Sequence, residues 1–164
     1  MRQARKTILF IEDDHETATL ISEELVERGF DVHVAFTGVD GFSAILKVQP
    51  DLVLSDISMP DGSGFDVLKW FAAATSGFRK VPFVFLTAMA DSDVELEARR
   101  LGADGFVTKP VDFDLLDAAI SARLAGSARN DSLPKCRREP SRGGSVDLDI
   151  RRTRDASGIV RTDR

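Results

Sequence analysis

The feature that most constrains the fold of this chain is an alternation of short apolar runs with helix-like segments, repeated five times before residue 125. The runs have the length of strands, and the segments between them carry apolar residues at the spacing of one helix face. The predicted strands are Thr7–Ile11, Asp31–Phe36, Leu52–Ser55, Val81–Leu86 and Gly105–Thr108. The predicted helices are Glu16–Arg28, Gly38–Val48, Phe65–Ala74, Asp93–Leu101 and Asp112–Leu124. Such a repeat predicts a parallel sheet with right-handed crossover helices on both faces.

The order of the strands follows from the same pattern. The first, third and fourth runs are apolar throughout, which indicates strands that are buried on both faces. Among doubly wound sheets we favour the flavodoxin-like order 2-1-3-4-5, because it places the first and third strands side by side at the topological switch point. The predicted fold class is therefore α/β, with a flavodoxin-like doubly wound sheet of five parallel strands and five helices in three α/β/α layers.

Polar residues stand where four of these strands end. Glu12 and Asp13 follow the first strand, Asp56 the third, Thr87 the fourth and Lys109 the fifth. The carboxyl ends of parallel strands share one edge of the sheet, so we expect these side chains to converge there. Crowded carboxylates favour a bound cation, and a lysine beside a hydroxyl favours an anion. The sequence therefore predicts a site for a cation and a phosphoryl group.

This set of residues resembles the receiver domain of two-component response regulators, in its single-domain, chemotaxis-receiver form. The resemblance covers residues 6–125 and includes the loop sequence 56–64 and the Lys109-Pro110 step. It implies that Asp56 is the phosphoacceptor and that Thr87 and Lys109 bind the phosphoryl oxygens. It also implies a histidine kinase or a histidine phosphotransfer protein as the phosphodonor.

The acidic residues are expected to hold Mg²⁺. Up to three carboxylates within a few ångströms disfavour their joint ionisation, and a hard cation with oxygen ligands relieves that repulsion. The resemblance implies that Asp13 and Asp56 are direct ligands and that Glu12 acts through water. It adds the backbone carbonyl of Ser58 to the ligands. Asp14, the third consecutive acid, is expected outside this set.

A conformational switch is the expected consequence of phosphorylation. A phosphoryl group adds a charge of about −1.5 to −2, which can bias a bistable loop. The resemblance implies that Thr87 moves toward the phosphoryl group and that Phe106 turns inward with it. The surface that responds is formed by the fourth helix, the fifth strand and the last helix. We expect it to contact a target protein or a second copy of the chain, although the sequence does not identify the target.

Composition bounds the setting of the protein. The chain has 164 residues and a single cysteine, Cys136, which fits a reducing compartment. No export signal is visible, and no segment approaches the roughly 20 apolar residues of a membrane span. We therefore expect a soluble cytoplasmic protein without membrane contact.

The last part of the chain differs in charge from the rest. Residues 1–125 hold 12 Lys/Arg and 21 Asp/Glu, whereas residues 126–164 hold 10 and 6. We expect a receiver domain over residues 1–125 and a basic, mostly disordered linker and tail over 126–164. A short hairpin at 145–162 is the alternative, because Val146, Leu148 and Ile150 alternate with polar residues. No aromatic residue that could stack on bases follows Phe113. We therefore do not expect the basic tail to bind nucleic acid.

An enzyme is the main competing interpretation. Phosphatases of the dehalogenase-like class also use an aspartate nucleophile and Mg²⁺, but they carry a second aspartate two residues later, where this chain has Ser58. A flavodoxin is disfavoured by the acidic residues after the first strand, and a receiver that has lost phosphorylation by the intact Asp56, Thr87 and Lys109. We expect no enzyme in the usual sense, since the protein would catalyse only its own phosphorylation and dephosphorylation. No output domain is expected, so the protein would act by protein contact, phosphoryl relay or dimerisation.

Overall fold

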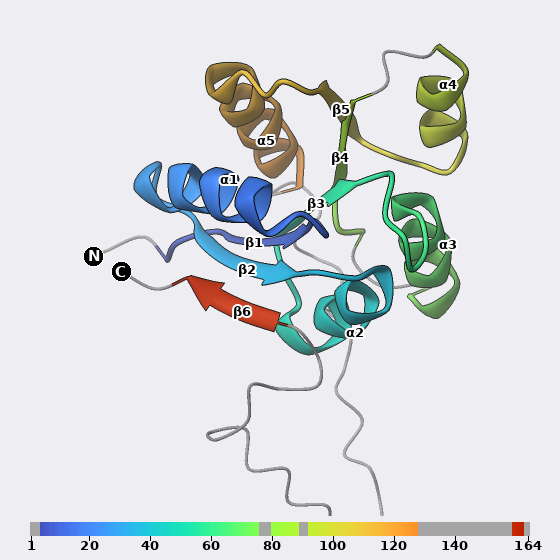
Figure 1. Ribbon diagram of the computed structural model, residues 1–164, viewed down its shortest axis with the longest axis horizontal. Coiled ribbons are helices and arrows are strands. Elements are labelled where there is room, and N and C mark those ends of the chain that lie inside the picture. Colours follow the sequence, from blue (N-terminus) through green and yellow to red (C-terminus); the bar gives the residue numbers. More distant parts are fainter. Residues whose placement is uncertain (1–3, 76–79, 89–91, 128–158, 163–164) are drawn as a thin grey trace, which may run out of the picture.

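The computed structural model describes residues 4–75, 80–88, 92–127 and 159–162, which form an α/β/α sandwich (Figure 1). The strands are β1 (Thr7–Ile11), β2 (Asp31–Ala35), β3 (Leu52–Asp56), β4 (Phe83–Thr87), β5 (Gly105–Thr108) and β6 (Ile159–Thr162). The helices are α1 (His15–Glu27), α2 (Gly38–Val48), α3 (Gly64–Ala74), α4 (Ser92–Arg100) and α5 (Phe113–Ser127). All ten elements predicted before residue 125 are present. The last helix extends beyond that residue, to Ser127.

The sheet has the predicted parallel order. Its strands lie in the order β5-β4-β3-β1-β2-β6, and the first five in the chain are parallel to one another. The order 2-1-3-4-5 is thereby confirmed. In the register, Ile11 pairs with Ser55 and Thr87 pairs with Thr108. The carboxyl ends of β1, β3, β4 and β5 therefore reach the same edge of the sheet.

A sixth strand was not predicted as part of this sheet. The segment β6 pairs antiparallel with β2 at the outer edge (red in Figure 1). Ile159 and Val160 belong to the tail that was expected to be mostly disordered, with a hairpin at 145–162 as the alternative. In the structure their pairing partner is β2, because the outer edge of that strand offers peptide groups that no parallel neighbour uses. The other half of the alternative hairpin, residues 145–150, lies outside the described residues.

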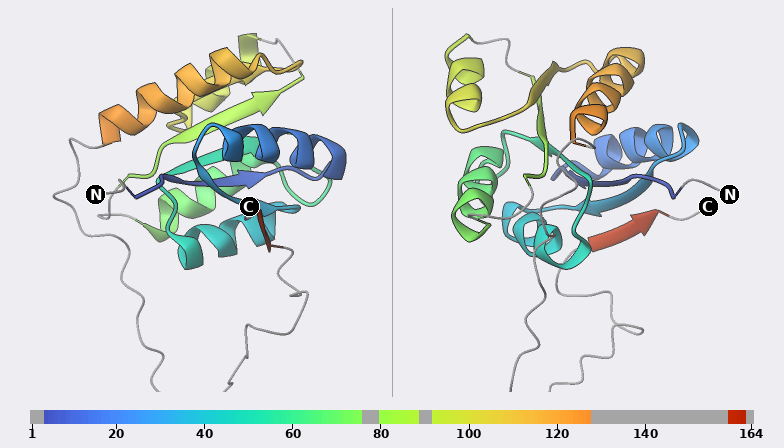
Figure 2. Two further views of the ribbon diagram at one scale, coloured as in Figure 1. Left: turned by 90° about the vertical axis from the view of Figure 1, so that its left-hand side faces the viewer. Right: turned by 180° about the vertical axis from the view of Figure 1, so that it is seen from behind.

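The core consists of two apolar layers, one on each face of the sheet. Helices α1 and α5 cover one face, and α2, α3 and α4 cover the other (Figure 2). Alternation along β1 serves both layers, since Ile8 and Phe10 pack on the α1/α5 side while Leu9 and Ile11 pack on the opposite side. All four are completely buried. This explains why the central runs are apolar without interruption.

The loop after β3 returns tightly to the sheet through Gly64. The amide of Gly64 donates to the carbonyl of Ile57 at 3.0 Å. A Cβ atom on Gly64 would collide with the backbone oxygen of Asp56 and lie 2.9 Å from the ring of Phe85. Glycine is therefore required here for close packing, and this packing fixes where the Asp56 loop begins.

Among the helices that the structure describes, none combines the length and the apolar composition required to cross a membrane.

Candidate metal and phosphoryl site

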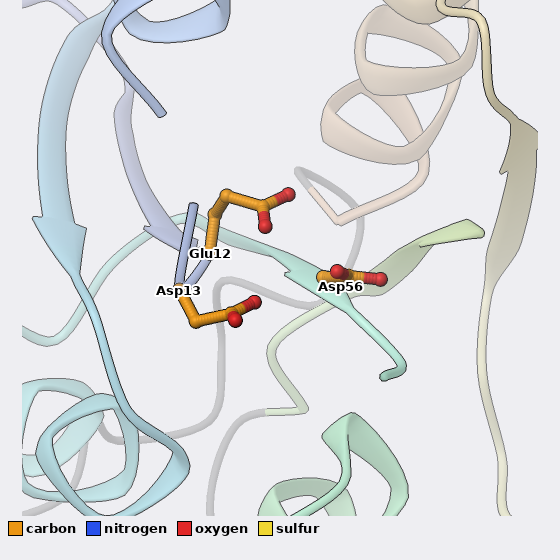
Figure 3. Close-up of side chains that lie close together, drawn as sticks. All are labelled: Glu12, Asp13 and Asp56. Carbon is orange, nitrogen blue, oxygen red and sulfur yellow. The ribbon is translucent and has the colours of Figure 1, made fainter. Parts of the chain in front are cut away.

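Three acidic side chains converge at the carboxyl edge of the sheet. Glu12, Asp13 and Asp56 each offer a carboxylate oxygen, and these oxygens lie within 4.8 Å of one another (Figure 3). Glu12 is only 1% exposed and Asp56 only 7%, while Asp13 is half-buried. These are the three carboxylates that the sequence placed together. An all-oxygen donor set of this kind fits Mg²⁺.

Backbone pairing fixes the carboxylates in place. The amide of Glu12 donates to the carbonyl of Ala35 at 3.0 Å, which ties the end of β1 to the end of β2. Asp56 is the last residue of β3, and the amide of Ile57 after it donates to the carbonyl of Leu86 at 3.3 Å. Asp56 therefore belongs to the sheet and Glu12 directly follows it with its backbone bonded to β2, which suits a site that must hold its geometry.

The ammonium group of Lys109 lies between two of the acids. Its Nζ atom is 2.8 Å from Oε2 of Glu12 and 3.3 Å from Oδ2 of Asp56. The backbone amide of Lys109 donates to the carbonyl of Thr87 at 2.7 Å, which anchors the end of β5 to the end of β4. The sequence predicted that this lysine binds an anion near the site. It did not predict that the lysine is paired with both Glu12 and Asp56.

Burial and charge act in opposite directions on these groups. Burial raises the pKa of Glu12, and the charge of Asp56 raises it further, although the hydrogen bond from Lys109 opposes both effects. Burial on its own would lower the pKa of Lys109. The hydrogen bond to Glu12 and the charges of Glu12 and Asp56 together outweigh burial, so the pKa of Lys109 is raised. Glu12 thus keeps its proton more readily than an exposed glutamate, and Lys109 stays charged.

The raised pKa of Glu12 predicts a pH-dependent stability that Glu12→Gln removes. Below the usual pKa of 4.5, Glu12 is protonated in both the folded and the unfolded chain, so its contribution is fully present. As the pH rises through the raised pKa, the folded state loses this contribution, at no more than about 1.4 kcal/mol per pH unit. The free energy of unfolding of the wild type, minus that of Glu12→Gln, should therefore fall as the pH rises.

Denaturant unfolding from pH 4 to 8 in a buffer with a metal chelator measures this difference. Glutamine keeps the shape of the side chain and lacks the titration, so most other pH effects cancel. If the free energies of unfolding of the two proteins changed with pH in parallel, the raised pKa of Glu12 would be contradicted.

Asp14 has a separate structural role. Its Oδ1 atom accepts hydrogen bonds from the amides of Glu16 at 2.8 Å and Thr17 at 3.0 Å, which caps α1. The bond from Thr17 and the bond from Glu16 lower the pKa of Asp14. The amide of Asp14 also donates to Oε1 of Glu12 at 3.2 Å. The three consecutive acids therefore divide between the site and the helix cap.

The surroundings of Asp56 include two serines. The amide of Ser58 donates to Oδ1 of Asp56 at 3.3 Å, so this residue contacts the carboxylate through its N–H. The metal-ligand role of the Ser58 carbonyl stays a prediction. Ser55, which was not predicted as a site residue, donates its hydroxyl to the backbone oxygen of Asp56 at 2.9 Å and is completely buried. A serine at the end of the otherwise apolar run Leu52–Ser55 is the sequence signal that could have identified this residue.

Thr87 and Phe106, the two predicted switch residues, lie on the neighbouring strands β4 and β5. Thr87 ends β4 and is 2% exposed. Phe106 pairs with Phe85 in the β4–β5 register. Phe106 also lines a pocket of about 580 Å³ between α4, β5 and α5, together with Arg99 and Leu115. The role of Thr87 and Phe106 in a conformational switch stays a prediction.

The fold and this edge of the sheet define a class of protein. A family model for the response regulator receiver domain matches residues 8–121. The chain belongs to the response regulator receiver domain family. The resemblance to receiver domains that the sequence motifs indicated is confirmed, whereas the single-domain form stays a prediction.

Curated relatives are regulators that are longer than this chain. The transcriptional regulatory protein DltR of Streptococcus agalactiae is 38% identical over 121 residues, covering 74% of this chain and 53% of DltR. The transcriptional regulatory protein CusR of Escherichia coli is 31% identical over 121 residues, covering 74% and 52%. The regulatory protein LuxO of Vibrio cholerae is 35% identical over 123 residues, covering 74% and 26%. The matched part is therefore about half of DltR and CusR and a quarter of LuxO.

Solved structures agree with the fold. The signal receiver domain of a putative LuxO repressor protein from Vibrio parahaemolyticus superposes with a TM-score of 0.72 at 26% identity, covering 79% of this chain and 97% of that one. A CheY-like receiver domain protein from Methanospirillum hungatei gives a TM-score of 0.69 at 26% identity, covering 77% and 99%. The five-stranded part of the present sheet is thus a receiver fold.

Proposed function

We propose that this receiver accepts a phosphoryl group on Asp56 from a histidine kinase or a histidine phosphotransfer protein. The observation that carries the proposal is the position of Asp56 beside Glu12, Asp13 and the Lys109 ammonium. A carboxylate oxygen of Asp56 would form the new bond to phosphorus while the bond to the donor breaks, and the leaving group takes a proton. When bound, Mg²⁺ would neutralise charge on the acids and the phosphoryl oxygens.

Lys109 and Thr87 have distinct parts in this proposal. The ammonium of Lys109 already lies 3.3 Å from Asp56, so it can donate a charge-assisted hydrogen bond to a phosphoryl oxygen. Thr87 would donate its hydroxyl to another oxygen. Asp13, Asp56 and the Ser58 carbonyl would bind the metal directly, with Glu12 acting through water. The acidic cluster, made only of oxygen donors, supports this arrangement.

The output would be a change in the surface formed by α4, β5 and α5. Leu96 on α4 is 57% exposed and Leu115 on α5 is 65% exposed. Leu115 lines the pocket, and exposed apolar side chains on such a surface favour a protein partner. DltR and CusR are named transcriptional regulatory proteins. For this chain we propose output through protein contact at this surface, with a target, a relay partner or a second copy, and phosphorylation as the trigger.

Treatment with a small acyl phosphate and Mg²⁺ tests the phosphoacceptor and the switch together. Wild type should gain the mass of one phosphoryl group, and a chelator should prevent the gain. Thr87→Ala should still be labelled, with a rate lowered by no more than about tenfold, because one neutral hydrogen bond is lost. Amide chemical shifts of Leu96 and Leu115 should change on phosphorylation of wild type and change far less in the variant.

Thr19→Ala is the matched control, since Thr19 lies on α1, outside the surface formed by α4, β5 and α5, and its side chain is exposed. It should keep both the labelling and the shift changes. Equal responses from the two alanine variants would contradict the switch role of Thr87 and leave the phosphoacceptor role standing.

A further inference from the structure

The direction of the peptide groups along β2 follows from two backbone hydrogen bonds. The amide of Asp31 donates to the carbonyl of Lys6 at 2.9 Å, and the carbonyl of Ala35 accepts from Glu12 at 3.0 Å. Peptide groups alternate in direction along a strand, so those of Asp31 and Ala35 face β1. The N–H and C=O groups of the even-numbered residues of β2 therefore face away from β1, toward the open edge.

The segment β6 occupies that edge. Figure 2 shows β6 beside β2. In the antiparallel register, Val32 lies opposite Thr162 and Val34 lies opposite Val160. These two are the hydrogen-bonded pairs of the ladder, because their β2 members direct their peptide groups outward. The remaining positions of β6, Ile159 and Arg161, are then the ones whose amides face away from β2.

The paired end of β2 is the part that holds Glu12. Val34, bonded outward, directly precedes Ala35, whose carbonyl accepts from the Glu12 amide. Glu12 in turn belongs to the acidic cluster and bonds to Lys109. Docking of β6 therefore restrains the backbone on which one wall of the site is built.

We expect the net free energy of β6 docking to be small, because the entropy lost on docking and the hydrogen bonds gained are similar in size. The connection from α5 to β6 contains 31 residues, so closing it costs entropy. Ordering a four-residue strand costs more, and the ladder hydrogen bonds give only a modest net return. Small changes in the segment can therefore release it or hold it.

We infer that the segment 159–162 is a positioning element for the acidic site, which acts by pairing with the outer edge of β2 in its own chain. When β6 is docked, the end of β2 is fixed and Glu12 is held for Mg²⁺. When β6 is released, the edge frays and the metal binds more weakly. The metal part of this inference rests on the proposed function, whereas the docking part does not.

Two proline variants of the full chain separate docking from a general effect of proline. Val160→Pro removes an amide that faces β2, while Arg161→Pro removes one that faces away, and proline is tolerated at such an edge position. In Val160→Pro, hydrogen exchange of the Val32 and Val34 amides should speed up by about tenfold or more. In Arg161→Pro it should stay within about twofold of wild type.

Mg²⁺ titration followed by amide chemical shifts gives the second readout. The dissociation constant of Val160→Pro should rise by about three- to tenfold, a loss expected when support outside the ligands is removed, and that of Arg161→Pro should not change. Exchange of the Phe10 amide in the centre of the sheet should be the same in all three proteins.

Several outcomes would overturn the inference. They are equal exchange in the two proline variants, faster exchange at Phe10 as well, and unchanged Mg²⁺ affinity once the edge amides have lost protection. A dimer of the wild type that Val160→Pro dissociates would show that the strand of a second copy is the occupant, which also overturns it. If wild type binds no Mg²⁺ at all, the metal site of the proposed function fails, and the amide exchange still reports docking separately.

Discussion

Asp56→Asn is expected to abolish labelling by a small acyl phosphate in the presence of Mg²⁺. The asparagine amide has the shape of the aspartate but is neutral, so it cannot act as the nucleophile or bind the metal as a carboxylate does. Loss of a nucleophile costs about 10³-fold or more in rate, which places labelling of the variant below detection. Intact mass after a fixed treatment time measures the effect directly.

Asp61→Asn is the matched control for this prediction. Asp61 lies in the same loop between β3 and α3, and its side chain is exposed. The same chemical change at this position should leave labelling unaltered. Labelling of Asp56→Asn to the stoichiometry of wild type would place the phosphoacceptor elsewhere. The variant should stay folded, because Lys109 keeps its 2.8 Å contact with Glu12.

The fold could be predicted because local signals agree with the global arrangement. The apolar run of β1 is buried on both faces, with Ile8 and Leu9 each completely covered. That double burial is what distinguishes a central parallel strand from a half-exposed one. The choice of strand order then brought Glu12 and Asp56 to one edge, where the structure places them.

The sheet edge could not be predicted in the same way. Pairing of β6 with β2 joins segments more than 120 residues apart in the chain, and the four residues of β6 carry no pattern that selects a partner. The sequence indicated a mostly disordered tail, with a local hairpin as the alternative, because local turns are the only pairings that spacing reveals. Whether β6 pairs with a neighbouring segment or with the open edge of β2 depends on the folded sheet, which the local sequence does not describe.

The pairing of side chains within the site could not be predicted from the sequence either. Strand-end positions predicted which groups meet, but not that Lys109 pairs with Glu12 more closely than with Asp56. Such a preference depends on side-chain reach and burial in the folded site. By contrast, the position of Asp14 outside the acidic cluster was predicted, and the structure shows that it caps α1.

Lys109→Met is expected to have the largest effect on stability in metal-free buffer. The substitution removes the ammonium that lies 2.8 Å from Glu12 and 3.3 Å from Asp56, and leaves two buried carboxylates facing each other. Breaking a buried ion pair costs about 3 to 5 kcal/mol. Because the lysine side chain is 23% exposed, solvent screening reduces this cost. We therefore expect the free energy of unfolding to fall by about 2 to 3 kcal/mol, as measured by denaturant unfolding.

Lys80→Met provides the control, since Lys80 pairs with Asp104 at 3.1 Å but its side chain is 63% exposed. Its loss should cost less than about 1 kcal/mol. A cost as large as that of Lys109→Met would mean that the effect follows from removing any paired lysine, and not from the buried position of Lys109.

Mg²⁺ should reduce the difference in the free energy of unfolding between Lys109→Met and wild type. In wild type the ammonium competes with the metal for Glu12 and Asp56, whereas in the variant the carboxylates have no other counter-charge. Mg²⁺ should therefore bind the variant more tightly and stabilise it by more at the same concentration. Trp70, whose ring lies against Gly62 in the loop after Asp56, provides a fluorescence signal for the titration. If Mg²⁺ stabilised the variant less than wild type, Lys109 would have to support the metal site in the unphosphorylated protein, and the proposed competition would be wrong.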